Sequence, residues 1–232
     1  MFDIITNALR GQFDVVQALS YVFATLLIIF TVLPLHEFAH AWSAYKLGDG
    51  TAKMMGRLSI NPMVHIDWFG AAMIMLFGFG WARPVPVNMR NFNNPKWGMA
   101  LTSLAGPVSN LIAGFISRAI YHVLIFLFSG MFIPSGIVLT ILQIVVSLFY
   151  FLSEINVGLA VFNLLPVPPL DGSRLLTAIL PDRIYYKIMQ YERMIMMVLM
   201  LLIFTGVLTL PLSLIRGGIM TLFDLPFNLL LK

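Results

Sequence analysis

Residues 15–35 read VVQALSYVFATLLIIFTVLPL, a run of 21 residues that contains no Asp, Glu, Lys, Arg or His. A helix of that length spans the roughly 30 Å hydrocarbon core of a bilayer. The whole chain has the same character, since 59% of its 232 residues are hydrophobic, 10% are charged and the mean hydropathy is +0.92. An average soluble domain carries about 25% charged residues. The sequence therefore predicts an integral membrane protein and excludes a soluble globular enzyme, a disordered chain and, with no cysteine present, a disulfide scaffold.

Three later runs also lack Asp, Glu, Lys and Arg, and they cover residues 97–117, 119–153 and 194–215. Turn-forming Ser, Gly and Pro residues between 129 and 136 divide the middle run between two helices. We therefore expect four membrane-spanning helices, at about residues 15–46, 98–128, 135–164 and 190–210. Residues 212–232 are apolar but carry Arg216 and Asp224, so they form either a further crossing or an interfacial helix. The expected architecture is an all-α polytopic membrane protein, with about four to six transmembrane helices in a single domain over residues 1–232.

A fifth apolar segment, residues 68–82, is too short to cross the membrane. Basic residues lie on both sides of it, namely Lys46, Lys53 and Arg57 before it and Arg83, Arg90 and Lys96 after it. More follow the third long run: Arg174, Arg183, Lys187 and Arg193. Cytoplasmic loops are rich in Lys and Arg, so residues 44–97 and 171–193 are expected in the cytoplasm and the N-terminus outside. Residues 68–82 should then dip into the membrane and return. The basic residues behind the net charge of +4 are expected to face anionic lipid rather than nucleic acid.

The first apolar run ends in His36-Glu37-Phe38-Ala39-His40. Two histidines four residues apart on a helix share one face, so both imidazoles can reach one cation. A glutamate beside the first histidine can take a proton from water at the metal and later pass it to a leaving amine. This spacing is typical of zinc metalloproteases, and an ionisable cluster inside a membrane span indicates a functional site. The alternative is that the histidines mark the water interface and that Glu37 pairs with a lysine such as Lys46.

A catalytic zinc site needs a third protein ligand, which in this cysteine-free chain must be His, Asp or Glu. The candidates are His65, Asp67, His122, Glu154, Asp171 and Asp49, the last expected to be exposed. We prefer Asp171, because prolines at positions 166, 168 and 169 force an extended segment that can turn its carboxylate back toward the histidines. Asp67 is instead expected to cap a helix, and His65 to pack at the interface.

Isolated polar groups and glycines also lie within the predicted spans. Arg118 and Glu154 are lone charges, but their depths differ by about 15 Å, so we do not expect them to pair. Gly106 and Gly114 are spaced for close helix contact around Asn110.

Three motifs together resemble the site-2 protease family of intramembrane zinc metalloproteases: His36–His40, Gly106-Pro107-Val108-Ser109-Asn110 and Asn163–Gly172. Residues 48–62 and 83–88 resemble its compact prokaryotic members, which lack a PDZ or CBS domain. The resemblance implies that His36, His40 and Asp171 hold one Zn²⁺ per chain and that Glu37 is the catalytic base. It also implies a multi-pass protein of the cell membrane, acting on transmembrane protein substrates, with a helical core and a short re-entrant β-like element that fits residues 68–82.

The expected activity is an intramembrane zinc endopeptidase, open to the cytoplasm, that cuts peptide bonds in or near transmembrane segments. Asn163 is a candidate donor to the substrate backbone or the oxyanion, or else a helix C-cap. Residues 79–88 are strand-like, and they either pair with an unwound substrate or form a plain loop that closes the site. Two alternative functions stay open: a membrane-bound peptidase for soluble or juxtamembrane peptides, and a catalytically silent scaffold that retains zinc. The sequence leaves the oligomeric state undetermined.

Overall fold

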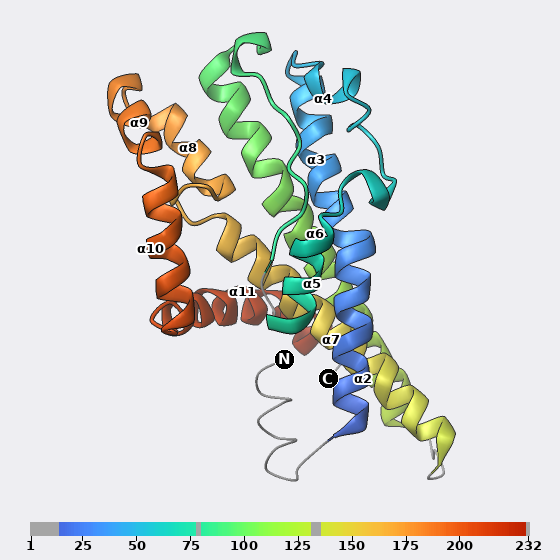
Figure 1. Ribbon diagram of the computed structural model, residues 1–232. Coiled ribbons are helices and arrows are strands. Elements are labelled where there is room, and N and C mark those ends of the chain that lie inside the picture. The colour runs from blue at the N-terminus through green and yellow to red at the C-terminus, as the bar shows by residue number, and fades with distance from the viewer. Residues whose placement is uncertain (1–13, 78–79, 131–135, 231–232) are drawn as a thin grey trace.

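The computed structural model describes residues 14–77, 80–130 and 136–230, and every regular element in them is helical (Figure 1). In chain order the α-helices are α2 (Val15–Leu27), α3 (Leu33–Lys46), α4 (Thr51–Met54), α5 (Trp68–Phe77), α6 (Pro95–Ser129), α7 (Ile137–Asn163), α8 (Asp171–Ile179), α9 (Asp182–Met189), α10 (Glu192–Phe204) and α11 (Thr209–Leu230). A π-helical turn, Ile28–Val32, joins α2 to α3, and short 3-10 turns lie at Pro62–Val64 and Met89–Asn91. The predicted all-α polytopic architecture is confirmed.

Among the described residues, four helices are long and apolar enough to cross a membrane: Val15–Lys46, Pro95–Ser129, Ile137–Asn163 and Thr209–Leu230. The first three agree with the sequence prediction, but the crossing predicted at residues 190–210 is wrong. Helix α10 has only 13 residues, which is about 20 Å. It ends because the chain turns at Gly206, whose φ of +73° lies in the left-handed region that glycine tolerates. The apolar tail forms the 22-residue α11 instead, and this helix runs at a steep angle to α10 (Figure 1).

Helices α2 and α3 form one continuous 32-residue span that is widened in its middle. Pro34, near the start of α3, has no N–H to donate, and its ring crowds the carbonyl four residues earlier. The π-helical turn Ile28–Val32, directly before α3, absorbs that mismatch. Such turns are frequent at functional sites, and this one lies one turn before His36.

Helices α6 and α7 form the centre of the bundle, with α3 and α8 against α6 and with α2 and α11 against α7. The α6–α7 contact is close because Gly114 has no side chain, and a Cβ there would lie 3.0 Å from Cγ2 of Val157. The Ser153 hydroxyl donates to the Gly114 carbonyl across the same contact, at 2.9 Å. Small residues at such contacts are how helices associate in a bilayer.

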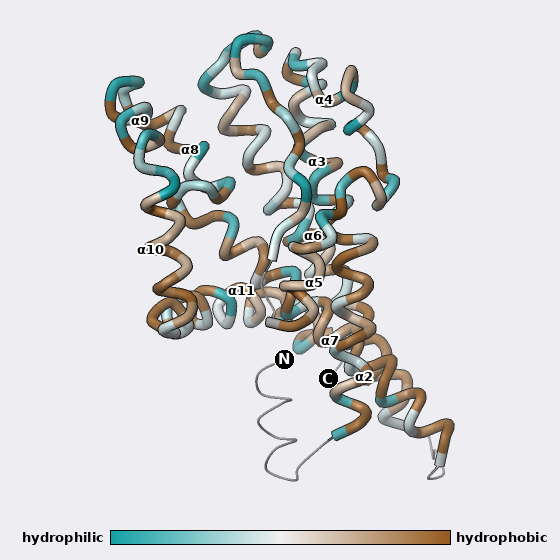
Figure 2. The backbone as a smooth tube through the Cα atoms, in the orientation of Figure 1, coloured by the Kyte–Doolittle hydropathy of each residue, from teal (hydrophilic) through white to brown (hydrophobic). Residues whose placement is uncertain are grey.

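Hydrophilic residues gather at one end of the molecule (Figure 2). Helices α4 and α9 lie at this end, whereas α2 and α7 are hydrophobic over most of their length. The two basic regions that the sequence assigns to one side of the membrane, residues 44–97 and 171–193, therefore include neighbouring surfaces at one end of the bundle.

The chain turns back after α5 instead of continuing. A Cβ on Gly70 would overlap the carbonyl oxygen of Trp81, and a Cβ on Gly80 would overlap that of Gly70, so the two stretches pack backbone to backbone. Residues 80–88 are extended but belong to no strand in the described part of the chain. Pro84 and Pro86 lack the N–H groups that a strand ladder needs. The expected β-like element at residues 68–82 is therefore wrong for the described residues, because Trp68–Phe77 form the helix α5 and no strand follows it. Phe79, the first residue of the strand-like segment, lies outside the described residues.

Candidate metal centre

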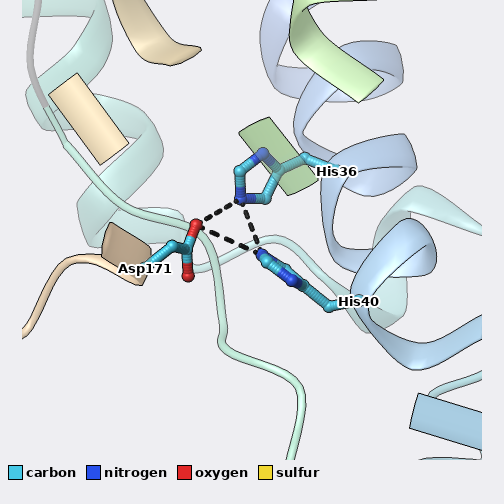
Figure 3. A group of neighbouring side chains, drawn as sticks. All are labelled: His36, His40 and Asp171. Atoms are coloured by element: carbon cyan, nitrogen blue, oxygen red, sulfur yellow. Dashed lines mark hydrogen bonds and ion pairs between the residues drawn. The ribbon is translucent and has the colours of Figure 1, made fainter. Parts of the chain in front are cut away.

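Three side chains from two distant parts of the sequence meet inside the bundle (Figure 3). Nε2 of His36 lies 3.0 Å from Nε2 of His40, and Oδ2 of Asp171 lies 3.2 Å and 3.3 Å from these two nitrogens. Both histidines are buried, with 5% and 7% of their surface exposed. All three ligand atoms lie within 4.8 Å of one another, close enough to hold a single metal ion. The third ligand that the sequence favoured thus lies beside the histidine pair.

Each ligand is positioned by the element that carries it. Helix α3 supplies both histidines one turn apart, so their ring centroids lie 4.6 Å from each other. Asp171 is the first residue of α8 and follows a tight loop over residues 164–170, which turns the chain back after α7. A side chain on Gly172 would overlap the carbonyl oxygens at the end of α7 and the start of this loop. Glycine at that position therefore lets the loop fold close enough to aim Asp171 at α3.

Helix α6 forms the wall behind the histidines. Nδ1–H of His40 donates to the carbonyl oxygen of Thr102 at 2.7 Å, which leaves Nε2 of that ring free for a cation. One turn further on, Gly106 faces both rings. A Cβ there would lie 2.5 Å from Nε2 and 2.6 Å from Cε1 of His36, and closer still to Nε2 of His40. The ligand rings occupy the space that this glycine leaves.

The residues present fit a zinc ion. Two imidazole nitrogens and one carboxylate oxygen are a donor set of catalytic zinc sites. Burial on its own raises the pKa of the Asp171 carboxyl, but in the absence of metal the charge of a protonated His40 and hydrogen bonds from both imidazoles outweigh burial and hold that pKa below its usual value. Asp171 is therefore ionised near neutral pH, as a metal ligand must be.

Glu37 lies next to this group without belonging to it. The side chain is buried, and Oε2 accepts a hydrogen bond of 2.9 Å from the backbone N–H of Val85. The guanidinium of Arg57 donates to the carbonyls of Arg83 and Pro84, which holds the same extended chain in place. Residues 80–88 therefore pass over the Glu37 carboxylate. Sequence reasoning missed this contact because a backbone donor leaves no signal in residue type.

Asp49 anchors the far end of the extended chain, and the expectation that it is exposed is wrong. It is fully buried, and it accepts hydrogen bonds from the Thr51 hydroxyl at 2.5 Å, the Asn88 N–H at 2.7 Å, the Asn91 side chain at 2.9 Å and the Thr51 N–H at 3.0 Å. Burial alone would raise the pKa of Asp49, but these hydrogen bonds outweigh burial and lower it. The carboxylate is fully engaged by these donors, so it is not available to a metal.

Two other candidates for the third ligand also have partners elsewhere. His65 is fully buried, with Nε2 2.6 Å from the carbonyl oxygen of Ser59. Asp67 accepts a hydrogen bond of 2.8 Å from the N–H of Gly70 in the first turn of α5, as its predicted capping role requires. Neither residue contributes to the group formed by His36, His40 and Asp171.

Charged residues inside the spans pair with α11. Arg118 donates two hydrogen bonds to the Asp224 carboxylate, at 2.6 and 2.8 Å, and Nε2 of His122 lies 2.7 Å from the same carboxylate. Glu154 pairs with Arg216 at 3.2 Å. Arg118 and Glu154 thus have separate partners, in agreement with their different predicted depths. Sequence reasoning missed both partners, although the tail carries one charge of each sign to match the two lone charges in the spans.

Asn163 is the last residue of α7 and lies eight positions before Asp171. Its side chain is partly buried. The cap of α7 is made by the backbone of Leu164, whose N–H donates to the carbonyl of Ala160 at 3.0 Å. Asn163 therefore belongs to the last helical turn, on the segment that leads to Asp171.

Comparison with known proteins points in the same direction. The sequence model of Peptidase family M50 matches residues 24–206. A Bacillus subtilis (strain 168) protein named "Putative zinc metalloprotease YwhC" is 40% identical over 218 residues, which cover 92% of this chain and 95% of that protein. A Mycolicibacterium smegmatis protein named "Putative zinc metalloprotease Rip2" is 29% identical over 167 residues, which cover 68% of this chain and 59% of that protein. No solved structure matches the chain significantly.

Proposed function

The chain belongs to peptidase family M50, the site-2 protease family of zinc metalloproteases, and we propose that it hydrolyses peptide bonds in or near transmembrane segments of membrane-protein substrates. In this proposal His36, His40 and Asp171 hold one zinc ion per chain, and Glu37 is the general base. In the same proposal residues 1–232 act as a single membrane-embedded domain, supported by the packing of α2, α3, α8 and α11 around the α6–α7 centre.

The observation that supports this proposal most strongly is that the buried His36 and His40 and the half-buried Asp171 lie together beside Glu37. The histidines and the glutamate lie within a 32-residue apolar span. Placing ionisable groups in a membrane costs free energy, so their presence there indicates a function. A site at this depth favours a substrate that is itself in the bilayer or at its surface over a freely soluble protein. We infer that the substrate segment unwinds locally, because a peptide carbonyl inside an intact helix is not accessible to attack.

When bound, zinc supplies Lewis acidity and lowers the pKa of its water toward about 7. Glu37 takes a proton from the attacking water as its oxygen bonds to the substrate carbonyl carbon. Glu37 then gives a proton to the leaving amine nitrogen as the carbon–nitrogen bond breaks. Asn163 donates an amide N–H to the substrate backbone or to the developing oxyanion, where a donor in a dry site is most effective.

We further propose that the site opens to the cytoplasm and that the N-terminus lies outside. Support comes from the basic residues of segments 44–97 and 171–193, which the positive-inside rule assigns to the cytoplasm. Helix α4 of the first segment and helix α9 of the second lie at the hydrophilic end of the bundle (Figure 2).

The test compares bacterial cells that express wild-type protein with cells that express Glu37→Gln at matched levels. New N-termini in the membrane fraction are labelled at their amines and located by mass spectrometry. Wild type is expected to generate termini within or next to transmembrane segments that are absent with Glu37→Gln. Termini confined to soluble regions would favour a peptidase for soluble or juxtamembrane peptides, and no difference between the two cultures would favour a silent scaffold. Either result overturns the proposal.

A further inference from the structure

Eight side-chain atoms are buried without a hydrogen-bond partner among the described residues, and four of them belong to three side chains of the α3, α6 and α7 packing: Nδ1 of His36, both polar atoms of Asn110 and Oδ1 of Asn156. Both asparagines are fully buried. A buried polar atom left unpaired costs about 1–3 kcal/mol, and almost all such atoms in proteins have a partner. Unpaired atoms on neighbouring turns of packed helices therefore call for a common explanation.

The unpaired atoms belong to a series of residues that begins on the face of α6 packed behind the histidines. Thr102, Gly106 and Asn110 are spaced by four along α6, so they share the face that packs on α3. Thr102 bonds to His40, and the missing side chain of Gly106 makes room for both rings. Helices α3 and α6 run antiparallel where they pack, since Thr102 meets His40 and Gly106 faces both rings. Asn110, one turn further along α6, therefore lies next to His36 on the side away from His40.

Asn156 continues the series onto α7. A Cβ on Gly114, one turn after Asn110 on α6, would lie 3.4 Å from Cβ of Asn156. The Asn156 side-chain nitrogen already donates to the carbonyl of Leu152 at 2.8 Å, so only its oxygen is unpaired. Asn110 therefore lies between a ring nitrogen on α3 and an amide oxygen on α7.

The unpaired atoms are complementary as donors and acceptors. With Nε2 of His36 turned toward Asp171, Nδ1 carries the proton and needs an acceptor. Asn110 offers one oxygen to accept and one nitrogen to donate, and the Asn156 oxygen can only accept. One chain of hydrogen bonds satisfies all four atoms, running from His36 to Asn110 to Asn156 and ending on the Leu152 carbonyl.

We propose that Asn110 is the positioning residue of His36: its side-chain oxygen accepts the Nδ1 proton, directly or through one bound water, and Asn156 holds the Asn110 amide in that orientation. Histidines that bind metal donate their other ring N–H to an oxygen, which fixes the tautomer and the direction of the ring. His40 uses the Thr102 carbonyl in this way. The two asparagines do the same for His36 from α6 and α7.

This inference rests on the proposed zinc site, so the test measures zinc binding rather than cleavage. Full-length protein in detergent, all in the Glu37→Gln background, is titrated with zinc against a chromophoric chelator. The variants are Asn110→Leu, which removes the relay, Asn110→Asp, which keeps an acceptor, and Asn156→Leu. Ser153→Ala is the matched control, because Ser153 is a buried polar residue at the same α6–α7 contact but bonds only to Gly114 and Met220.

Loss of an outer hydrogen-bond partner weakens metal binding by about 10–100-fold. We expect a loss in that range for Asn110→Leu, a smaller loss for Asn156→Leu, recovery to within about threefold in Asn110→Asp, and no change in Ser153→Ala. The visible spectrum of the Co²⁺-loaded protein should shift in Asn110→Leu and return in Asn110→Asp, which a merely structural role would not produce.

Unchanged zinc affinity in a folded Asn110→Leu protein overturns the proposal, as does an equal loss in Ser153→Ala. If Asn110→Leu does not fold, then Asn156→Leu and Asn110→Asp decide, since the relay requires a weakened site in the first and a retained site in the second. Failure of the starting protein to bind zinc overturns the zinc site itself, which is distinct from a site that binds zinc but ignores Asn110.

Discussion

Replacing Gly106 by alanine adds one methyl group where α6 faces both histidine rings. The new Cβ would lie 2.5 Å from Nε2 of His36, whereas ordinary van der Waals contact begins at 3.4 Å. The rings or the helix must therefore move by at least about 0.9 Å, since the Cβ would lie closer still to His40, and a displacement of about 1 Å at a reacting site reduces rates about 100-fold. Metal–ligand distances tolerate only about 0.2 Å. We expect zinc affinity in Gly106→Ala to fall at least about 100-fold and cleavage to fall with it.

The assay is zinc titration against a chelator, followed by thermal unfolding of the same samples. Gly158→Ala on α7 is the matched control, since nothing lies within 4 Å of a Cβ at that position. Both substitutions raise helix propensity by about 1 kcal/mol, so the control isolates the steric effect. Overpacking should offset that gain in Gly106→Ala by about 1–3 kcal/mol. A Gly106→Ala protein that binds zinc as tightly as Gly158→Ala would refute the view that α6 sets the ligand geometry.

Three further substitutions test separate contacts. Val85→Pro removes the N–H that donates to Glu37 while keeping the chain extended, so turnover should fall about tenfold at unchanged zinc content. Val87→Pro is the control, and an equal fall in its turnover would argue against a specific contact between Val85 and Glu37. Asp49→Asn should lower the free energy of unfolding by about 2 kcal/mol at pH 7, measured by thermal or denaturant unfolding. The pKa of Asp49 is lower in the folded than in the unfolded protein, so the ionised carboxylate contributes fully to the free energy of unfolding above the unfolded pKa of about 3.9. That contribution disappears as the pH falls through the lower folded pKa. A stability difference between wild type and Asp49→Asn that persists in strong acid would contradict this origin. Arg118→Leu removes two of the hydrogen bonds to the Asp224 carboxylate and leaves it paired with His122 alone, so it should destabilise the protein by up to about 3–5 kcal/mol. The double variant with Asp224→Leu should recover most of the loss of melting temperature.

Three of the four spans, and the group formed by His36, His40 and Asp171, could be predicted from the sequence because both depend on strong local signals. A 21-residue run without charge has few alternatives to a membrane helix, and the spacing of His36 and His40 is meaningful only on a helix. Asp171 required one further step, in which prolines exclude a helix before it and so permit the chain to turn back. The structure brings that residue to within 3.3 Å of both rings.

The errors have two physical causes: a local backbone turn in one case, and partners elsewhere in the chain in the others. The span predicted at residues 190–210 counted apolar residues across Gly206, where the backbone takes a left-handed turn. Asp49 has the composition of an exposed loop residue, and only its donors at Thr51, Asn88 and Asn91 explain its burial. The contact between Glu37 and Val85 involves a backbone donor 48 positions away, and the pattern of side chains in the sequence cannot predict such a contact.

The most direct test of the central claim is the zinc content of the purified full-length protein. Wild type, His36→Ala and Asp171→Ala are purified side by side in detergent and analysed for metal, with Glu37→Gln as the variant that should keep it. We predict about one zinc per chain in wild type and in Glu37→Gln, none in His36→Ala and weakened binding in Asp171→Ala. Zinc that is retained at full affinity in Asp171→Ala, or wild-type protein that binds none, would contradict the account.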